Sequence, residues 1–295
     1  MKAIVCIPAY NEELTIASIV VLSKKYTDVV CVIDDGSKDR TAEVANAAGA
    51  VVLSHGKNRG YGAAINSCLE KAKKEKADSL VIIDGDGQHD PKDIPKVLEG
   101  LQNGADLVIG SRFHSKNEIP AYRRAGISAL TTLTNAGSGV PVSDSQSGFR
   151  AYNANAVSKL VGLKNAGMGA SSEILMKASE VGLKISEVPI TVRYFDHVSK
   201  RNALIHGLGV TTSVLDIIRL RKPFAFFGVV GVIALVLGGI FGIYTLDLYN
   251  ANKALPFGPT MLTVFFTLTG MLCVLAALIL DSVNRIVESR EENDE

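Results

Sequence analysis

Apolar and polar positions alternate along the first third of the chain with two different periods. Short, nearly continuous apolar runs are typical of strands buried on both faces, and the stretches between them place apolar residues three or four positions apart, as amphipathic helices do. The predicted strands cover residues 3–8, 29–33, 50–54, 79–83 and 106–109, and the predicted helices cover residues 12–26, 41–48, 61–76 and 92–102. Strands that alternate with helices imply right-handed crossovers, so the sequence predicts an α/β fold with a mostly parallel sheet.

Two long apolar segments stand near the end of the chain. Residues 224–246 and 257–280 contain no Asp, Glu, Lys or Arg. As helices, both are long enough to span the ~30 Å hydrocarbon core of a bilayer. The polar segment 247–256 between them suits a tight turn. We therefore expect a two-helix transmembrane hairpin within residues 223–281, followed by a tail at 282–295. Two buried core helices are the alternative interpretation.

The segment before the hairpin is amphipathic. Residues 201–222 place Leu204, Leu208, Leu215 and Ile218 at helical spacing and end in a basic cluster. This pattern predicts a helix that lies in the membrane interface. A helix packed on the sheet would show the same apolar stripe, so that alternative stays open.

The placement of basic residues predicts the orientation of the hairpin. Three of them precede the first apolar segment within residues 219–222 and two follow the second within residues 285–290, whereas the turn holds only Lys253. Because Lys and Arg are enriched on the cytoplasmic side, we expect an integral membrane protein with residues 1–200 and both termini on that side. A net charge of +1, without basic residues interleaved with aromatic ones, argues against nucleic-acid binding.

Polar side chains follow the predicted strands at the points where these strands end. Asp34 and Asp35 follow the second strand, Asp84 and Asp86 the fourth, and Arg112 the fifth. Parallel sheets bind ligands at this edge, and two residues at alternate positions can project to the same side. Crowded carboxylates are costly unless a cation lies between them, and oxygen ligands suit Mg²⁺ or Mn²⁺. The pattern predicts a divalent metal site; helix capping is the alternative for any single residue.

Six short motifs occur in order along residues 3–200. They are PAYNE at 8–12, DDGSKDRT at 34–41, NRGYGAA at 58–64, DGDGQHDP at 84–91, GSR at 110–112 and SGFR at 147–150. Together they resemble the family 2 glycosyltransferases, and particularly the synthases of dolichyl- or polyprenyl-phosphate sugars, such as those of the dolichol-phosphate mannose synthase type. The resemblance implies that residues 1–200 form a GT-A type domain, which binds a nucleotide sugar on a mixed, mostly parallel sheet.

The resemblance also implies roles for individual residues. The metal, Mg²⁺ or Mn²⁺, would be held by Asp84, Asp86 and Gln88. Catalytic roles would fall to Asp84, Asp86, Arg112 and Asp144. The nucleotide sugar would be bound by Pro8, Tyr10, Glu12, Asp34, Asp35, Asn58, Gly85 and Arg112.

A lipid phosphate acceptor needs cationic contacts rather than a general base. Its second pKa lies near ~6, so it is largely a dianion already, whereas a hydroxyl acceptor would have to lose a proton to a base. Arginine is well suited to bidentate phosphate contacts. Candidates outside the nucleotide motifs are Arg123, Arg124, Arg150, Arg193 and Lys200. Arg123 and Arg124 would equally suit a solvated basic face.

Two positions leave alternatives open. Asp144 matches an acidic position that acts as a base in family members with hydroxyl acceptors; beside a phosphate acceptor it would instead orient a neighbouring arginine. His197 stands where members of the family commonly have glycine, and Arg193 lies seven residues before Lys200. The role of Arg193 is therefore less firmly implied than the others.

We expect a metal-dependent, inverting hexosyltransferase that moves a sugar from GDP-mannose, UDP-glucose or UDP-N-acetylglucosamine to dolichyl or another polyprenyl phosphate. One alternative is transfer to a hydroxyl of a lipid-linked glycan with Asp144 as base. Another is a membrane scaffold that has lost turnover. Because two spans are few for holding a long isoprenoid, association into a homo-oligomer is a further expectation.

Overall fold

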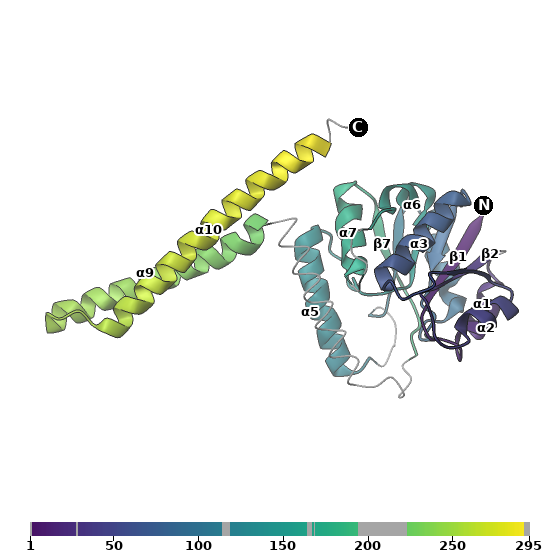
Figure 1. The fold of residues 1–295 in the computed structure, drawn as a ribbon, viewed down its shortest axis with the longest axis horizontal. Helices are drawn as coiled ribbons and strands as arrows, with labels where there is room; N and C mark the ends of the chain where they lie inside the picture. The colour runs from purple at the N-terminus through teal and green to yellow at the C-terminus, as the bar shows by residue number, and fades with distance from the viewer. Residues whose placement is uncertain are drawn as a thin grey trace. The chain divides into compact units, whose positions relative to one another are not determined.

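The computed structural model describes residues 2–27, 29–113, 119–163, 167, 169–193 and 223–291. The chain divides into two compact units, Met1–Val214 and Leu215–Glu295. Within its described residues, the first unit is an α/β domain and the second is a pair of long helices (Figure 1). Lys200 and the predicted interfacial helix at 201–222 lie outside the described residues.

The α/β domain is built on one seven-stranded sheet in the order β3-β2-β1-β4-β6-β5-β7. Its strands are β1 (Ala3–Ala9), β2 (Val29–Asp34), β3 (Val51–Ser54), β4 (Ser79–Ile82), β5 (Leu107–Ser111), β6 (Arg150–Asn153) and β7 (Ile185–Pro189). β6 is antiparallel to both of its neighbours, β4 and β5, and all other neighbouring pairs are parallel. The predicted mixed, mostly parallel sheet is confirmed.

Helices cover both faces of this sheet (Figure 1). One face carries α1 (Ile16–Ser23), α2 (Thr41–Ala47) and α4 (Ile94–Gln102); the other carries α3 (Tyr61–Lys74), α6 (Ala154–Leu160) and α7 (Ala170–Glu180). Along β1, Ile4 and Cys6 join the cluster under α3, whereas Val5 and Ile7 join the cluster under α1. The strand is buried on both sides, which explains why its sequence is a continuous apolar run.

Two further helical segments complete the domain. The 3-10 turn η1 (Pro91–Asp93) leads into α4, and α5 (Ala121–Ser138) lies beside α7 (Figure 1). A hydrogen bond of 2.9 Å joins the hydroxyls of Thr134 in α5 and Ser172 in α7. Both hydroxyls are buried, so this contact fixes α5 against the domain through polar rather than apolar groups.

The first helix begins later than the sequence pattern predicts, at Ile16 rather than at residue 12. Thr15 Oγ1 donates to the carbonyl of Gly85 at 2.6 Å, and the backbone N–H of Glu12 donates to Thr41 Oγ1 at 2.7 Å. These contacts hold residues 12–15 against the segments that follow β4 and β2. The loop after β1 thus belongs to the edge where the parallel strands end.

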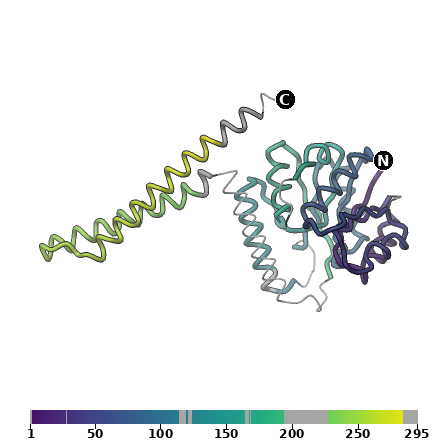
Figure 2. The backbone as a smooth tube through the Cα atoms, viewed as in Figure 1, coloured from purple at the N-terminus to yellow at the C-terminus, as the bar shows by residue number. Residues whose placement is uncertain are grey.

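The second unit consists of α9 (Pro223–Asn252) and α10 (Phe257–Glu291), which run side by side (Figure 2). Both are long and apolar enough to cross a membrane, and both continue past the predicted ends at residues 246 and 280. A Cβ on Gly231 would lie 2.8 Å from Val274 Cγ2, and a Cβ on Gly270 would lie 2.7 Å from Leu235 Cγ. Small residues thus allow the close approach of helices that is common in membranes.

A glycine within α4 gives a test of how closely this helix packs on β5 of the sheet. An alanine in a helix normally stabilises it by about 1 kcal/mol relative to glycine, but a Cβ on Gly100 would lie 2.9 Å from Val108 Cγ2. Overpacking of this kind costs about 1–3 kcal/mol. We expect Gly100→Ala to lower the thermal unfolding temperature of the detergent-solubilised protein by about 2–6 °C.

Gly126→Ala in α5 is the matched control, since a Cβ there meets nothing within 4 Å. It should leave the unfolding temperature unchanged or raise it. Combining Gly100→Ala with Val108→Ala should cost less than the sum of the two single changes, because they share one contact. Equal unfolding temperatures for Gly100→Ala and Gly126→Ala would contradict the proposed close packing of α4 on β5.

Candidate functional site

The loops after β1 and β4 meet at the carboxyl edge of the sheet. A Cβ on Gly85 would lie 3.1 Å from the carbonyl oxygen of Pro8 and 3.5 Å from Cγ of Glu12. Thr15 Oγ1 joins the same two loops, since it lies 3.3 Å from Glu12 Oε2 and donates to Gly85 O. The structure therefore brings together Pro8, Glu12 and Gly85, three of the residues that the resemblance implies for the nucleotide-sugar site.

Negative charge is concentrated at this edge. Burial, together with the charges of Asp86 and Asp84, raises the pKa of Glu12 to about 7. Burial and the neighbouring Asp84 carboxylate raise the pKa of Asp86 as well. In both cases loss of hydration on burial is the larger cause, and repulsion between like charges adds to it. A cation bound here would relieve it.

Asp84 is held by the contacts of its two carboxylate oxygens. Tyr61 donates to Oδ1 at 3.1 Å, and His89 Nε2 lies 3.5 Å from Oδ2. Burial opposes the ionisation of Asp84, but His89 and Tyr61 outweigh it, so the pKa of this carboxyl is lowered. Gly148 lies so close that a Cβ on it would overlap the Asp84 carboxylate. Only a residue without a side chain leaves Asp84 in this position.

The carboxylates could supply part of a metal site but not a complete one. Among the described residues, no group of three His, Cys, Asp or Glu side chains is arranged to hold a metal ion. Asp84, Asp86 and the amide of Gln88 offer hard oxygen ligands on one short segment, whose turn is closed by a 2.9 Å hydrogen bond from Gln88 N to Asp86 Oδ1. Mg²⁺ is commonly bound by one or two carboxylates together with substrate phosphates and water. The residues fit a metal that is held jointly with a diphosphate.

Asp35, which follows β2, is buried and organises the loop at residues 55–60. It is 4% exposed and accepts hydrogen bonds from the backbone N–H groups of Arg59 and Gly60 at 2.9 and 2.8 Å. Its Oδ1 also lies 2.7 Å from His55 Nδ1, while His55 Nε2 lies 2.9 Å from Ser67 Oγ. The carboxylate predicted to contact the nucleoside thus also shapes the chain around it.

Asp34, the last residue of β2, also organises the chain around it, since it holds the turn after β2 and the end of β3. Its carboxylate accepts from Ser37 N at 3.0 Å and from Ser54 Oγ at 2.9 Å. Gly36, which follows the two aspartates, has a φ of +72°, and a Cβ on it would overlap the backbone of Lys57. A left-handed conformation and a close backbone approach together explain the glycine of the DDGS motif.

Other predicted nucleotide-binding residues lie on the surface. Tyr10 is 40% exposed, so its ring is available for stacking, and Asn58 is exposed as well. Neither makes a side-chain hydrogen bond that fixes it within the described part of the chain.

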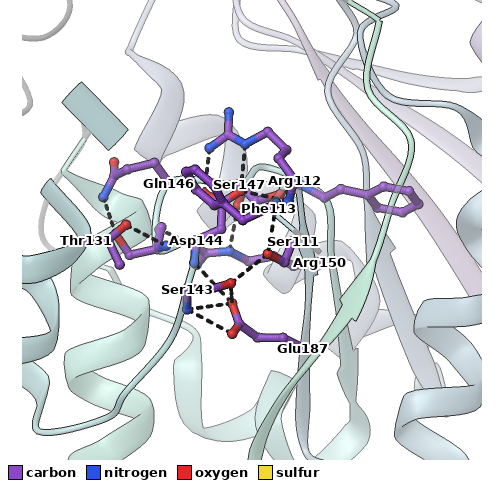
Figure 3. A network of polar contacts seen from close by, with 12 residues as sticks. Ser111, Arg112, Phe113, Thr131, Ser143, Asp144, Gln146, Ser147, Arg150 and Glu187 are labelled. Atoms are coloured by element: carbon purple, nitrogen blue, oxygen red, sulfur yellow. Dashed lines mark hydrogen bonds and ion pairs between the residues drawn. The ribbon is translucent and has the colours of Figure 1, made fainter. Parts of the chain in front are cut away.

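Arg112, directly after β5, is paired with Asp144 (Figure 3). Arg112 Nε donates to Oδ2 and Nη2 donates to Oδ1, both at 2.6 Å, and the backbone N–H of Arg112 donates to Oδ2 at 3.1 Å. The Asp144 side chain is completely buried, whereas that of Arg112 is 14% exposed. This geometry is a bidentate, charge-assisted pair that fixes the orientation of the guanidinium.

Arg150 differs from the prediction of an acceptor-phosphate contact. It is 2% exposed, and its guanidinium donates to the carbonyls of Ser147, Ser171 and Ser145 at 2.9, 3.1 and 2.6 Å. A buried guanidinium has to be satisfied by hydrogen bonds, and here backbone carbonyls fulfil this need. Arg150 therefore stabilises the loop that precedes β6.

The remaining residues predicted to bind the acceptor phosphate have different surroundings. Arg193 contacts the segment that follows β4 and contains Asp84, Asp86 and Gln88. Its backbone N–H donates to Gln88 O at 2.9 Å, and its Nη2 lies 3.1 Å from Asp90 Oδ2. Arg124 is exposed on α5, and its guanidinium lies 5.8 Å from the centre of the Phe113 ring. Arg123 belongs to α5, but its side chain, like Lys200, lies outside the described part of the structure.

Three residues at the site were not predicted from the sequence: Tyr61, Gly148 and Glu187. Tyr61 and Gly148 lie within the family motifs at 58–64 and 147–150, and this could have marked them as site residues. Their contact with Asp84, however, follows only from the fold. His89 is buried beside Asp84, and its Nδ1 has no hydrogen-bond partner within the described residues. Glu187, on the edge strand β7, has no motif around it.

Comparison with known proteins agrees with this geometry. The family described as glycosyl transferase family 2 matches residues 4–161. A UDP-N-acetylglucosamine–dolichyl-phosphate N-acetylglucosaminyltransferase of Methanococcus voltae is 34% identical over 218 residues, covering 66% of this chain and 87% of that protein. A dolichyl-phosphate hexose transferase of Haloferax volcanii is 32% identical over 213 residues, covering 70% of this chain and 90% of that protein.

A solved structure matches the fold. Glucosyl-3-phosphoglycerate synthase from Mycobacterium tuberculosis, crystallised with Mn²⁺, UDP and glucosyl-3-phosphoglycerate, superimposes with a TM-score of 0.60 at 24% identity, over 73% of this chain and 79% of that one. The predicted GT-A-like α/β domain is confirmed. The chain belongs to glycosyl transferase family 2 and is a glycosyltransferase.

Proposed function

We propose that this protein transfers a hexose from a nucleoside-diphosphate sugar to dolichyl or another polyprenyl phosphate, with inversion at the anomeric carbon and with the help of Mg²⁺ or Mn²⁺. Two relatives named as dolichyl-phosphate sugar transferases support the acceptor class. The partial oxygen ligand set of Asp84, Asp86 and Gln88 supports the metal. GDP-mannose, UDP-glucose and UDP-N-acetylglucosamine are the candidate donors.

The state of Asp144 is the observation that carries the proposal. This carboxylate is completely buried and accepts two hydrogen bonds of 2.6 Å from Arg112. To take a proton from an acceptor hydroxyl it would have to leave this pair, and breaking a buried ion pair costs about 3–5 kcal/mol. An acceptor phosphate is already ionised and needs no base. The geometry therefore favours a phosphate over a glycan hydroxyl.

The residues of the chain perform the remaining tasks by position. A metal bound at Asp84 and Asp86 would neutralise the charge that develops on the leaving diphosphate. Tyr61 and His89 hold the Asp84 carboxylate in its ionised form. Asp144 fixes the guanidinium of Arg112 at the carboxyl edge, where it stabilises phosphate charge. An acceptor phosphate oxygen then attacks the anomeric carbon opposite the leaving group, and a single displacement inverts its configuration.

The two apolar helices suit a lipid acceptor. α9 and α10 are long enough to span the bilayer as a hairpin, and the basic residues that flank the hairpin favour an orientation with both termini and the α/β domain on the cytoplasmic side. A water-soluble nucleotide sugar and a membrane-bound phosphate would meet at the same face. We also propose that copies of the chain associate, since two spans offer a small surface for an isoprenoid.

A transfer assay tests the function directly. Purified full-length protein in detergent, with Mn²⁺ or Mg²⁺, a short polyprenyl phosphate and a panel of UDP- and GDP-sugars, should yield a lipid-phosphate hexose, detected by mass spectrometry. Chelation of the metal and Asp86→Ala should each abolish the product, because the diphosphate loses its counter-charge. Glu43→Gln, a change on an exposed ion pair, is the control. Sugar transfer to a glycan hydroxyl but not to the lipid phosphate would refute the proposal.

Asp144→Asn separates the orienting role from the role of a base. We expect turnover to fall about 10- to 100-fold, because the guanidinium loses its ionic partner. The pH dependence of kcat/KM between about pH 6 and pH 9 should keep its wild-type shape, since no proton passes to this residue. Loss of a titration step from the pH profile of the variant would identify Asp144 as a base instead.

Gly148→Ala tests the close approach of the loop to Asp84. The added methyl group would displace the carboxylate, so binding of UDP or GDP in the presence of Mn²⁺ should weaken about tenfold. Titration calorimetry measures the dissociation constant. Gly126→Ala, which adds the same group in open space, should bind as the wild type does. Unchanged nucleotide affinity in Gly148→Ala would argue against a metal at Asp84.

A further inference from the structure

One loop of the α/β domain touches both charged groups of the proposed site. Residues 143–149, called here the 143–149 loop, contain no helix or strand and lead into β6. Near its start, Asp144 pairs with Arg112. Near its end, Gly148 lies against Asp84. The position of this loop therefore decides where the guanidinium stands relative to the metal-binding carboxylate.

The start of the loop is held by Glu187 of β7 (Figure 3). Glu187 Oε2 accepts from Ser143 N at 2.8 Å. Its Oε1 accepts from Ser143 N and Ser143 Oγ, both at 3.0 Å, and from Asp144 N at 3.1 Å. Two successive backbone N–H groups directed at one carboxylate form an anion-binding nest. Bonds of this kind, to an ionised acceptor, are about twice as strong as neutral ones.

Glu187 stands on β7, and Arg112 directly follows the neighbouring strand β5. In the parallel β5–β7 pair, Glu187 lies opposite Ile109, and Pro189 lies opposite Ser111, the residue before Arg112. The hydroxyls of Ser111 and Ser143 are 2.7 Å apart. Arg112 is thus anchored by β5, and its partner Asp144 is anchored by β7. The orientation of the ion pair follows from the sheet register.

We infer that Glu187 is a positioning residue for sugar transfer, which acts through Ser143 and Asp144 on the guanidinium of Arg112. The inference rests on the proposed role of Arg112 in contacting phosphate. A carboxylate is required because Ser143 and Asp144 approach Glu187 only with N–H and O–H donors, and an amide would place its NH₂ group against one of these donors. A shift of about 1 Å in a group that orients a substrate can cost about 100-fold in rate.

The rest of the loop has its own supports, so loss of the Glu187 contacts should move Asp144 without unfolding the loop. Arg150 donates to the carbonyls of Ser145 and Ser147, and Ser145 N donates to Thr131 Oγ1 at 3.2 Å. The residues after Asp144 are therefore held independently of β7.

A double-mutant cycle tests the inference with the full-length protein in detergent. Glu187→Gln should lower kcat about 10- to 100-fold, with a nearly unchanged KM for the nucleotide sugar and a similar unfolding temperature. In an Asp144→Asn background, the same substitution should change kcat by less than about twofold, because the two residues act in one chain. Glu99→Gln on the exposed side of α4 removes an equal charge elsewhere and should leave kcat unchanged.

Two results would overturn the inference: wild-type kcat in Glu187→Gln, or losses that simply multiply in the double variant, as a separate structural role would produce. If Glu187→Gln does not fold, Ser143→Ala takes its place, with a smaller loss of kcat that should also vanish in the Asp144→Asn background. A wild-type protein that uses another acceptor refutes the proposed function, and the cycle is then measured with that acceptor. Full turnover in Arg112→Ala would overturn both the inference on Glu187 and the proposed phosphate contact of Arg112.

Discussion

The reversed strand β6 is the constraint on which the arrangement of the site depends. Because β6 runs against its neighbours β4 and β5, the loop before it arrives at the carboxyl edge, where the parallel strands end. A parallel strand in this place would have brought its preceding loop to the opposite edge. The 143–149 loop thus lies between the segments that follow β4 and β5, and it contacts Asp84 through Gly148 and Arg112 through Asp144.

The buried charges around this loop are satisfied in different ways, and the differences suggest different tasks. The guanidinium of Arg150 donates to three backbone carbonyls, so its charge serves the fold. Arg112 keeps 14% of its side chain exposed, whereas its partner Asp144 is fully buried, so the ion pair fixes a guanidinium that is still partly accessible. The first arrangement stabilises a loop. In the proposed function, the second presents a fixed cation to a phosphate.

Features of the site that depend on neighbouring residues in the sequence could be predicted, whereas contacts between residues far apart in the chain could not. Asp84, Asp86 and Arg112 lie within a few residues of the ends of β4 and β5, so a local pattern sufficed to place them at one edge. The pairing of Arg112 with Asp144, and of Glu187 with Ser143, joins residues far apart in the chain, and no periodicity records it. Arg150 was misjudged for the same reason: an arginine that satisfies buried carbonyls looks, in sequence, like one that binds phosphate.

The contacts around Asp144 also connect the architecture with the choice of acceptor. An enzyme that activates a hydroxyl needs a base with freedom to gain and lose a proton. Here the only described carboxylate paired with Arg112 is sealed from solvent and held from both sides, by Arg112 and through its backbone by Glu187. In the proposed function, such a group contributes rigidity rather than proton transfer. The demand for a base disappears when the nucleophile is an ionised phosphate, and the apolar hairpin is suited to bring such a phosphate, on a lipid, to the protein.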